Sequence, residues 1–322
     1  MRRRAFVTGL VIALTAAGVR AQAPGRVVRI GVLSFGAAPA PGAPAEPVAR
    51  HLRALGYREG SNVVFERRYA DGVRERYPEF AAELVRSKVE VIFAQGSDVA
   101  HAFRDAATTV PVVFVVSDDP VATGLVRSLA RPGGLFTGIS LMSPELGEKR
   151  LEYLKLALPS LRRVAVLYDK GHEFYLAHMR SPAEKLGVVL LPIEFGGVPD
   201  LPGAFAAAAR ERAQAMFVAP TRFTLFYASR VAELSIQHRI PAISAYDIFA
   251  NAGGLLSYGP IQDDAIVRAA ALIDRILRGA KPAELPVEQP TRIVLVVNKR
   301  TAGALGITLP QALLQQAERV IE

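Results

Sequence analysis

VVRIGVLSF, residues 27–35, is a nearly continuous apolar run rich in β-branched side chains. Such a run is typical of a strand that is buried on both faces of a parallel sheet. Helical spacing of apolar side chains follows in residues 77–85 and again in residues 266–277. This alternation predicts an α/β fold with parallel sheets that helices cover on both sides. The other predicted strands are residues 63–69, 89–95, 110–117, 163–169, 188–195, 215–220, 241–246, 255–259 and 292–298.

The length of the chain indicates two units of this kind. Its 322 residues correspond to about two domains of roughly 150 residues each. About ten strands are also more than one doubly wound sheet ordinarily holds. Hydrophobic residues make up 51% and charged residues 21%, which excludes a disordered chain. The sequence therefore predicts two α/β lobes, with the proline-rich segment 279–290 as a connection between them.

The N-terminus has the pattern of an export signal. Three arginines at 2–4 precede an apolar stretch at 9–18 and the small-residue site Val19-Arg20-Ala21. The stretch is shorter than the ~20 residues that span a bilayer, so a membrane anchor is not expected. Residues 1–21 are predicted to be a signal peptide, with cleavage after Ala23 as the alternative. Because Arg3-Arg4-Ala5-Phe6 also resembles a twin-arginine signal, the Sec and twin-arginine routes both stay open.

The charge and the cysteine count exclude several classes of partner. The formal net charge is +9, but four of these positive charges lie in the predicted signal peptide, which leaves +5. The remaining Arg and Lys residues are scattered among acids, so no nucleic-acid partner is expected. The chain has no cysteine, which excludes disulfides, thiolate metal sites and a lipid-modified N-terminal cysteine.

Motifs of catalysis and of nucleotide binding are missing. The sequence contains no G-x-G-x-x-G after the first predicted strand, no phosphate loop and no G-x-S-x-G. His172 and His178 are six residues apart, which puts their imidazoles about 120° apart on a helix, so both are interpreted as surface histidines near a loop. We therefore expect no enzyme activity, no cofactor and no metal site.

Polar residues follow the predicted strands where ligands bind in open parallel sheets, at the carboxyl ends. Helix N-termini at these ends present free N–H groups, so Gly96-Ser97 suits a carboxylate. Capping of the following helices is the alternative explanation for any single loop. Six such loops from two lobes predict a ligand cleft instead. The predicted binding residues are Ser34, Phe35, Gln95, Gly96, Ser97, Ser117, Asp118, Tyr168, Thr221, Arg222, Tyr246 and Asp247.

Six longer stretches carry a resemblance to a known family. The sequence resembles the ABC-transporter substrate-binding proteins of the type I periplasmic-binding fold, in the branch that includes tryptophan- and tyrosine-binding proteins. The stretches span nearly all of the chain after the predicted signal. They are LRALGYREGSN at 52–62, ATTVPVVFVVSDDP at 107–120, GLVRSLARPGGLFTGIS at 124–140, ELGEKRLEYL at 145–154, AGGLLSYG at 252–259 and PVEQPTRIVLVVNKRTAGALG at 286–306.

The resemblance implies an architecture and a function. It implies two Rossmann-like lobes, joined by three crossovers near residues 143, 251 and 290, with the ligand between them. The first lobe would comprise 27–143 plus 252–289, and the second 144–251 plus 290–322. The protein would be a monomeric periplasmic solute-binding component of an ABC import system, whose partners are a membrane permease and an ATPase. An exported α/β enzyme and a sensory ligand-binding protein are the alternatives.

The ligand expected from this resemblance is a small molecule such as an amino acid or a related zwitterion. Its carboxylate would lie at Gly96-Ser97, its ammonium at Asp118, and its side chain among Phe35, Tyr168 and Tyr246. Two loops depart from the family pattern. Residues 169–172 read Asp-Lys-Gly-His where an Asn-Pro-rich loop is usual, and Thr221-Arg222-Phe223 replaces a small polar or acidic residue. If Arg222 enters the cleft, a second acidic group on the ligand is expected; a solvated helix start is the alternative.

Overall fold

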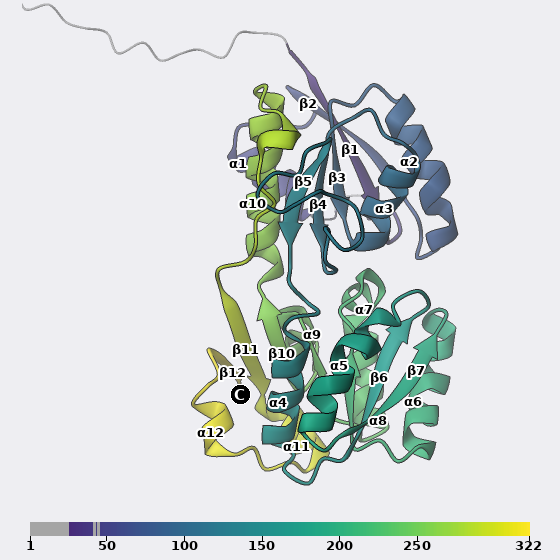
Figure 1. The fold of residues 1–322 in the computed structure, drawn as a ribbon, viewed down its shortest axis with the longest axis vertical. Helices are drawn as coiled ribbons and strands as arrows, with labels where there is room; N and C mark the ends of the chain where they lie inside the picture. The colour runs from purple at the N-terminus through teal and green to yellow at the C-terminus, as the bar shows by residue number, and fades with distance from the viewer. Residues whose placement is uncertain (1–25, 41–42, 44–45) are drawn as a thin grey trace, which may run out of the picture.

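The computed structural model describes residues 26–40, 43 and 46–322, and the predicted signal peptide at 1–21 lies outside this part of the chain. The described residues form two lobes that follow one another along the long axis of the molecule (Figure 1). Each lobe is a sheet of mostly parallel strands between helices. The predicted α/β class and the two-lobed architecture are confirmed.

The first lobe contains a five-stranded parallel sheet of order β2-β1-β3-β4-β5. Apolar side chains alternate between its two faces, because successive residues of a strand point to opposite sides. Val28, Ile30 and Val32 pack toward α1 (Pro47–Ala54) and α10 (Gln262–Leu277), and Leu33 packs toward α2 (Tyr77–Arg86) and α3 (Ser97–Asp105). The strands are β1 (Val28–Ser34), β2 (Val63–Tyr69), β3 (Val91–Gln95), β4 (Val112–Val116) and β5 (Phe136–Ser140).

The second lobe contains a seven-stranded sheet of order β12-β11-β10-β9-β8-β6-β7, in which only the β10–β11 pair is antiparallel. Helices α4 and α5 cover one face, and α6 and α8 cover the other (Figure 1). The strands are β6 (Arg163–Asp169), β7 (Val189–Phe195), β8 (Ala215–Val218), β9 (Ala242–Ser244), β10 (Leu256–Pro260), β11 (Ile293–Asn298) and β12 (Arg319–Ile321). The helices of this lobe are α4 (Gly147–Ala157), α5 (Phe174–Lys185), α6 (Leu201–Arg210), α7 (Arg222–Phe226), α8 (Ala228–Gln237), α9 (Asp247–Asn251), α11 (Lys299–Leu305) and α12 (Gln311–Leu314). A 3₁₀ turn lies at Val198–Asp200 in this lobe, and two others lie at Arg74–Arg76 and Pro282–Glu284 in the first lobe.

One predicted lobe boundary is wrong. The stretch that was assigned to the first lobe from residue 252 onward contains β10, which belongs to the seven-stranded sheet. Leu256 of β10 pairs with Ile243 of β9 on one side and with Val297 of β11 on the other. An apolar run shows that a strand is buried but not which sheet it joins. The middle crossover therefore runs at 260–262, and not near residue 251.

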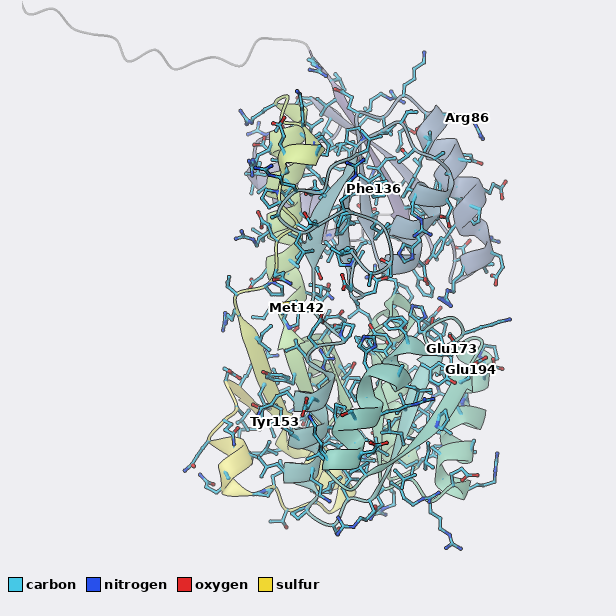
Figure 2. All side chains as sticks on the ribbon, in the orientation of Figure 1. Arg86, Phe136, Met142, Tyr153, Glu173 and Glu194 are labelled. Atoms are coloured by element: carbon cyan, nitrogen blue, oxygen red, sulfur yellow. The ribbon has the colours of Figure 1, made fainter. Side chains whose placement is uncertain are left out.

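Three segments connect the lobes. One follows β5, the second is the short step from β10 to α10, and the third leads from the 3₁₀ turn at Pro282–Glu284 to β11. Met142, labelled between the lobes in Figure 2, has a left-handed backbone with a φ of 51°. The backbone N–H of Ser140 donates to the carbonyl of Glu288 over 2.9 Å, so the first and third segments run side by side.

A buried arginine binds two of these connections at once. Arg150 of α4 is 0% exposed. Its Nε donates to the carbonyl of Tyr258 over 2.8 Å, and its Nη1 donates to the carbonyl of Ser143 over 2.7 Å. Tyr258 lies in β10 and Ser143 lies in the segment after β5. One guanidinium thus holds the start of the first crossover and the end of the strand that leads into the second.

Aromatic side chains also join the lobes. Phe35, which directly follows β1, places its ring edge-on to Phe223, Phe226 and Tyr227 of the second lobe, with centroids 5.5–6.1 Å apart. Through these rings the core beneath α2 and α3 continues into the core beneath α6 and α8. Among the described residues, no helix is both long enough and apolar enough to cross a membrane.

A pair of glycine substitutions tests the packing of the first sheet. A Cβ at Gly138 of β5 would lie 2.1 Å from the backbone oxygen of Phe114 in β4, and neither strand can yield. Gly203 of α6 has nothing within 4 Å of such a Cβ. Gly138→Ala should lower the free energy of unfolding by about 2 kcal/mol or more, and Gly203→Ala should raise it by about 0.5 kcal/mol. Urea unfolding curves measure both, and equal stabilities would contradict this packing.

Candidate ligand-binding site

A cavity lies between the lobes, at the carboxyl ends of β3, β4, β8 and β9. Its walls come from both lobes. The space within it that a water-sized sphere can occupy is about 20 Å³, which is room for about one water molecule. A molecule larger than water does not fit this space in the present arrangement of the lobes. The lining residues are Gln95, Gly96, Ser97, Asp98, Val115, Ser117, Leu141, His172, Tyr175, Pro220, Thr221, Arg222, Leu225, Tyr246 and Gln262.

The first-lobe wall is built by the turn from β3 into α3. Gly96 has a φ of 117°, a conformation that side chains with a Cβ rarely adopt, and it lets the chain reverse directly into the helix. Ser97 is the first residue of α3, and its Oγ accepts a hydrogen bond from the backbone N–H of Ser117 over 3.3 Å. This bond ties the end of β3 to the end of β4. The free N–H groups of the first turn of α3 lie at this wall.

The second-lobe wall is fixed by a capped short helix and by a tyrosine. Thr221 caps α7 through a reciprocal pair of hydrogen bonds with Thr224, which sets the direction in which Arg222 leaves the helix. Tyr246, at the end of β9, reaches the first lobe. Its hydroxyl lies 2.5 Å from Oγ of Ser117 and 3.5 Å from Oγ of Ser143. Polar contacts across the cavity thus accompany the aromatic contacts of Phe35.

An arginine links charged residues of the two lobes beside the cavity. Arg74 of the first lobe binds Asp98 of the same lobe and lies 3.1 Å from Oδ2 of Asp169 in the second. Its Nη1 also donates to the carbonyl of Lys170 over 2.7 Å. Because Asp169 is 3% exposed, its attraction to Arg74 is only weakly screened by water. This pair stabilises the arrangement in which the lobes lie close together.

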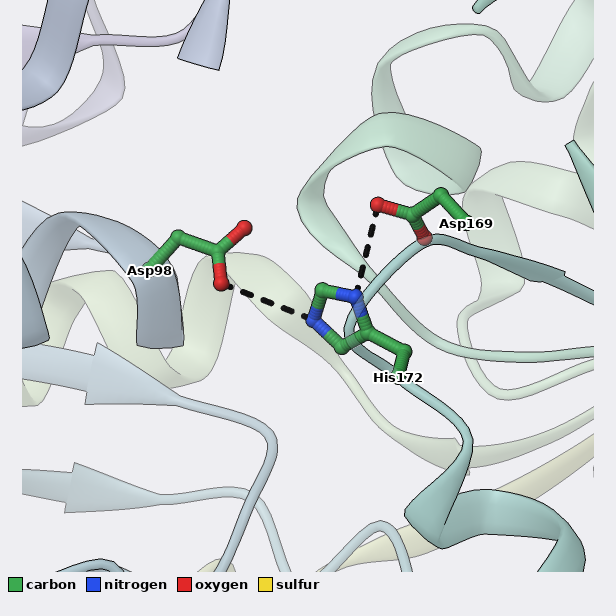
Figure 3. A group of neighbouring side chains, drawn as sticks. All are labelled: Asp98, Asp169 and His172. Atoms are coloured by element: carbon green, nitrogen blue, oxygen red, sulfur yellow. Dashed lines mark ion pairs between the residues drawn. The ribbon is translucent and has the colours of Figure 1, made fainter. Parts of the chain in front are cut away.

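His172 completes the charged group. Its Nε2 lies 3.7 Å from Oδ1 of Asp98 and its Nδ1 lies 3.4 Å from Oδ2 of Asp169, so the ring stands between carboxylates of the two lobes (Figure 3). Burial opposes the charged imidazole, but the hydrogen bond and charge of Asp169 outweigh it and raise the pKa of His172. Burial likewise opposes ionisation of Asp169, yet His172, Thr221 and Arg74 lower its pKa.

The same three side chains have the composition of a metal site. One ligand atom from each of Asp98, Asp169 and His172 lies within 4.8 Å of the others. Arg74, however, already contacts both carboxylates, and its Nη2 lies 3.3 Å from Nδ1 of His172. The guanidinium supplies the positive charge that a metal ion would otherwise bring. The group therefore acts as an ionic bridge between the lobes.

The structure brings seven of the twelve predicted binding residues to the cavity and places five elsewhere. The seven are Gln95, Gly96, Ser97, Ser117, Thr221, Arg222 and Tyr246. Ser34 lines a neighbouring cavity with Glu46 and Arg222. Phe35 packs in the interlobe aromatic contact, and Tyr168 packs in the second-lobe core. Asp247 lies 3.3 Å from Arg319 of β12.

Asp118 lies behind Ser97 and is not part of the cavity wall. It is 4% exposed, and its Oδ2 lies 3.6 Å from Nε2 of His101 on α3. Burial raises the pKa of Asp118 and lowers the pKa of His101, because both charged forms lose contact with water. A carboxyl group in this environment is a poor partner for a ligand ammonium. The three aromatic residues proposed for the ligand side chain do not converge either, since only Tyr246 reaches the cavity.

Eight lining residues were absent from the predicted set. Asp98 and Pro220 lie in loops from which only neighbouring residues were predicted to bind the ligand. His172 was interpreted as a surface histidine, whereas it is 6% exposed; only His178 of that pair is exposed. The loop at 169–172, which departs from the family pattern, was the available signal. The other missed residues are Val115, Leu141, Tyr175, Leu225 and Gln262.

Two α/β lobes, three connections and an interlobe cavity with walls from both lobes define the class of two-lobed solute-binding proteins. The model of the family described as "ABC transporter substrate binding protein" matches residues 29–321. The chain belongs to this family of ABC-transporter substrate-binding proteins.

Individual relatives are similar to this chain at low sequence identity. A tyrosine-binding protein of Clostridioides difficile is 22% identical over 260 residues, which are 80% of this chain and 74% of that protein. A conserved domain protein from Vibrio cholerae is 27% identical with a TM-score of 0.83, over 92% of this chain and 100% of that one. An ABC domain from Streptococcus pneumoniae, solved in complex with L-Trp, is 24% identical with a TM-score of 0.81 over the same shares.

The raised pKa of His172 predicts how stability depends on pH. A raised folded-state pKa means that the stabilising contribution is complete below the unfolded pKa of about 6.5 and disappears as the pH rises through the folded value. The melting temperature of the wild type, relative to that of His172→Asn, should therefore be highest below about pH 6.5 and should fall as the pH rises above it. The exposed His178→Asn is the matched control and should show no such change. A difference between wild type and His172→Asn that is constant with pH would contradict the ionic bridge.

Proposed function

We propose that this substrate-binding protein is an exported, monomeric receptor that binds an amino acid or a related small zwitterion between its lobes. The observation that carries the proposal is the cavity itself, because its polar lining comes from the ends of strands in both lobes. Such a site is complete only when the lobes are together. Ligand binding and lobe closure are then one event.

The amino-acid class is supported by the polar groups of the cavity and by the relatives. Ser97 begins α3 at the cavity wall, and the N–H groups of that turn favour a carboxylate. Tyr246 and Tyr175 offer aromatic surface on the opposite side. One relative is a tyrosine-binding protein, and one structural neighbour holds L-Trp.

The proposal includes closure of the lobes around the ligand. The TM-score is 0.81 against the tryptophan complex and 0.62 against a ligand-free, open substrate binding protein from Clostridium difficile, over the same 92% of this chain. This difference supports an arrangement of the lobes nearer to that of the complex. The three connecting segments are where bending would occur.

The partners follow from the export signal and from the family. A receptor delivers its ligand to a membrane permease that an ATPase drives, and the sequence contains no phosphate loop. The expected location is the periplasm, through a signal at residues 1–21. A sensory role, in which the ligand-bound form contacts a signalling protein, uses the same cavity. An exported enzyme would also need reacting groups at the cavity and would yield a product.

Ligand binding tests the receptor function. A thermal-shift screen of the amino acids should give hits whose stabilisation grows with ligand concentration, by about 2.7 kcal/mol at 100 times Kd. Ser97→Ala and Tyr246→Phe should weaken binding about tenfold, because each removes one hydroxyl group from the cavity wall. Ser229→Ala, an exposed change on α8, is the control and should leave Kd unchanged. Conversion of the ligand into a product would support the enzyme alternative.

Small-angle scattering tests whether the lobes close around the ligand. Small-angle scattering with a ligand from the screen should show a smaller radius of gyration than without it, since the open form exposes the cavity that the ligand fills. Arg74→Gln removes the link to Asp169 and should shift the ligand-free protein toward the larger value. Identical scattering curves with and without saturating ligand would contradict closure.

A further inference from the structure

Arg222 brings a positive charge into the space between the lobes. It is the first residue of α7, and its side chain lines both the interlobe cavity and the neighbouring cavity of the first lobe that contains Ser34. A Cβ at Gly96 would lie 3.4 Å from Cβ and 3.6 Å from Cδ of Arg222. The aliphatic stem of this second-lobe arginine therefore packs along the first-lobe turn that opens α3.

The guanidinium has no acidic partner among the described residues. Its Nε is buried without a hydrogen bond, although part of the side chain is accessible. Residues 1–25, 41–42 and 44–45, which the structure does not describe, contain no Asp or Glu. Burial lowers the pKa of Arg222, with no carboxylate to offset it. A buried charge without a counter-charge is costly, so this one is not explained by stability.

The two acidic residues that line these cavities are already paired. Asp98 binds Arg74, and Glu46 accepts hydrogen bonds from Arg67 and Tyr69. His172, the remaining titratable cation at the cavity, stands against Asp169. Among the described charged residues that line these cavities, Arg222 is therefore the one without a partner of opposite charge. A neutral zwitterion would bring a charge of each sign and leave the cavity with the same excess.

From this geometry we infer that the ligand is a small organic acid of net negative charge, with a carboxylate that pairs with Arg222. A guanidinium presents a planar fork of N–H donors, which suits the two oxygens of a carboxylate. The inference rests on the proposed receptor function and changes the expected ligand from a neutral zwitterion to an anion, either an acidic amino acid or another small carboxylate of net negative charge. The uncompensated charge is then neutralised only when the ligand is bound.

Charge-matched probes test the inference by isothermal titration calorimetry of the purified protein. L-glutamate and L-glutamine, and L-aspartate and L-asparagine, are pairs of similar size that differ by one negative charge; succinate and the remaining amino acids complete the panel. An acid should bind at least tenfold more tightly than its amide. Arg222→Gln should weaken binding of the acid about 100-fold and abolish the preference, and Arg222→Lys should retain part of both. Arg230→Gln, at a surface pair with Glu233 on α8, is the control and should change nothing.

The outcomes separate the inference from the receptor function. Tight binding of a neutral amino acid, unchanged in Arg222→Gln, would overturn the inference and leave the receptor function standing. A protein that binds no member of the panel would overturn both. A second measurement needs no ligand: Arg222→Met replaces the unpaired cation by an apolar side chain and should raise the melting temperature of the ligand-free protein. A clear fall would show that Arg222 stabilises the fold, and would overturn the inference.

Discussion

Parallel pairing is the constraint on which the site depends. In a parallel sheet all carboxyl ends lie at one edge, so every loop that leaves a strand toward the next helix gathers there. In this chain the two such edges face each other, since residues from β3 and β4 meet residues from β8 and β9 at one cavity. Arg74, Tyr246 and Arg222 can reach across only because of this orientation. The ionic, polar and aromatic contacts between the lobes are all consequences of it.

Much of the fold was predictable from the sequence, because burial on both faces leaves long apolar runs with β-branched residues. Two strands were not predicted. β5 has no apolar run, because Thr137 and Gly138 interrupt its five residues, and β12 is only three residues long. The sheet that β10 joins could not be predicted, because pairing with β9 and β11 leaves no mark on an apolar pattern. Hydrophobic patterning encodes burial, whereas sheet membership depends on the path of the connections.

The site was predictable to the level of the loop but not of the side chain. The choice of residues at strand ends correctly included Gln95, Ser97 and Arg222. It also included Tyr168, which packs in the second-lobe core, whereas its neighbour Asp169 contacts Arg74 of the first lobe. Adjacent residues at a strand end point to opposite faces, and a shift of one position exchanges them. His172 lies 3.7 Å from Asp98 of the other lobe, and a contact of this kind lies beyond local sequence patterns.

Arg150 gives two of the connecting segments a shared anchor. Its planar guanidinium holds the carbonyl of Ser143, in the segment after β5, beside the carbonyl of Tyr258, in the strand that leads to α10. A movement that pulled these two stretches of chain apart would break hydrogen bonds of a fully buried cation, which is costly. The first two connections are therefore coupled at this one side chain, and a change in the path of one is felt by the other.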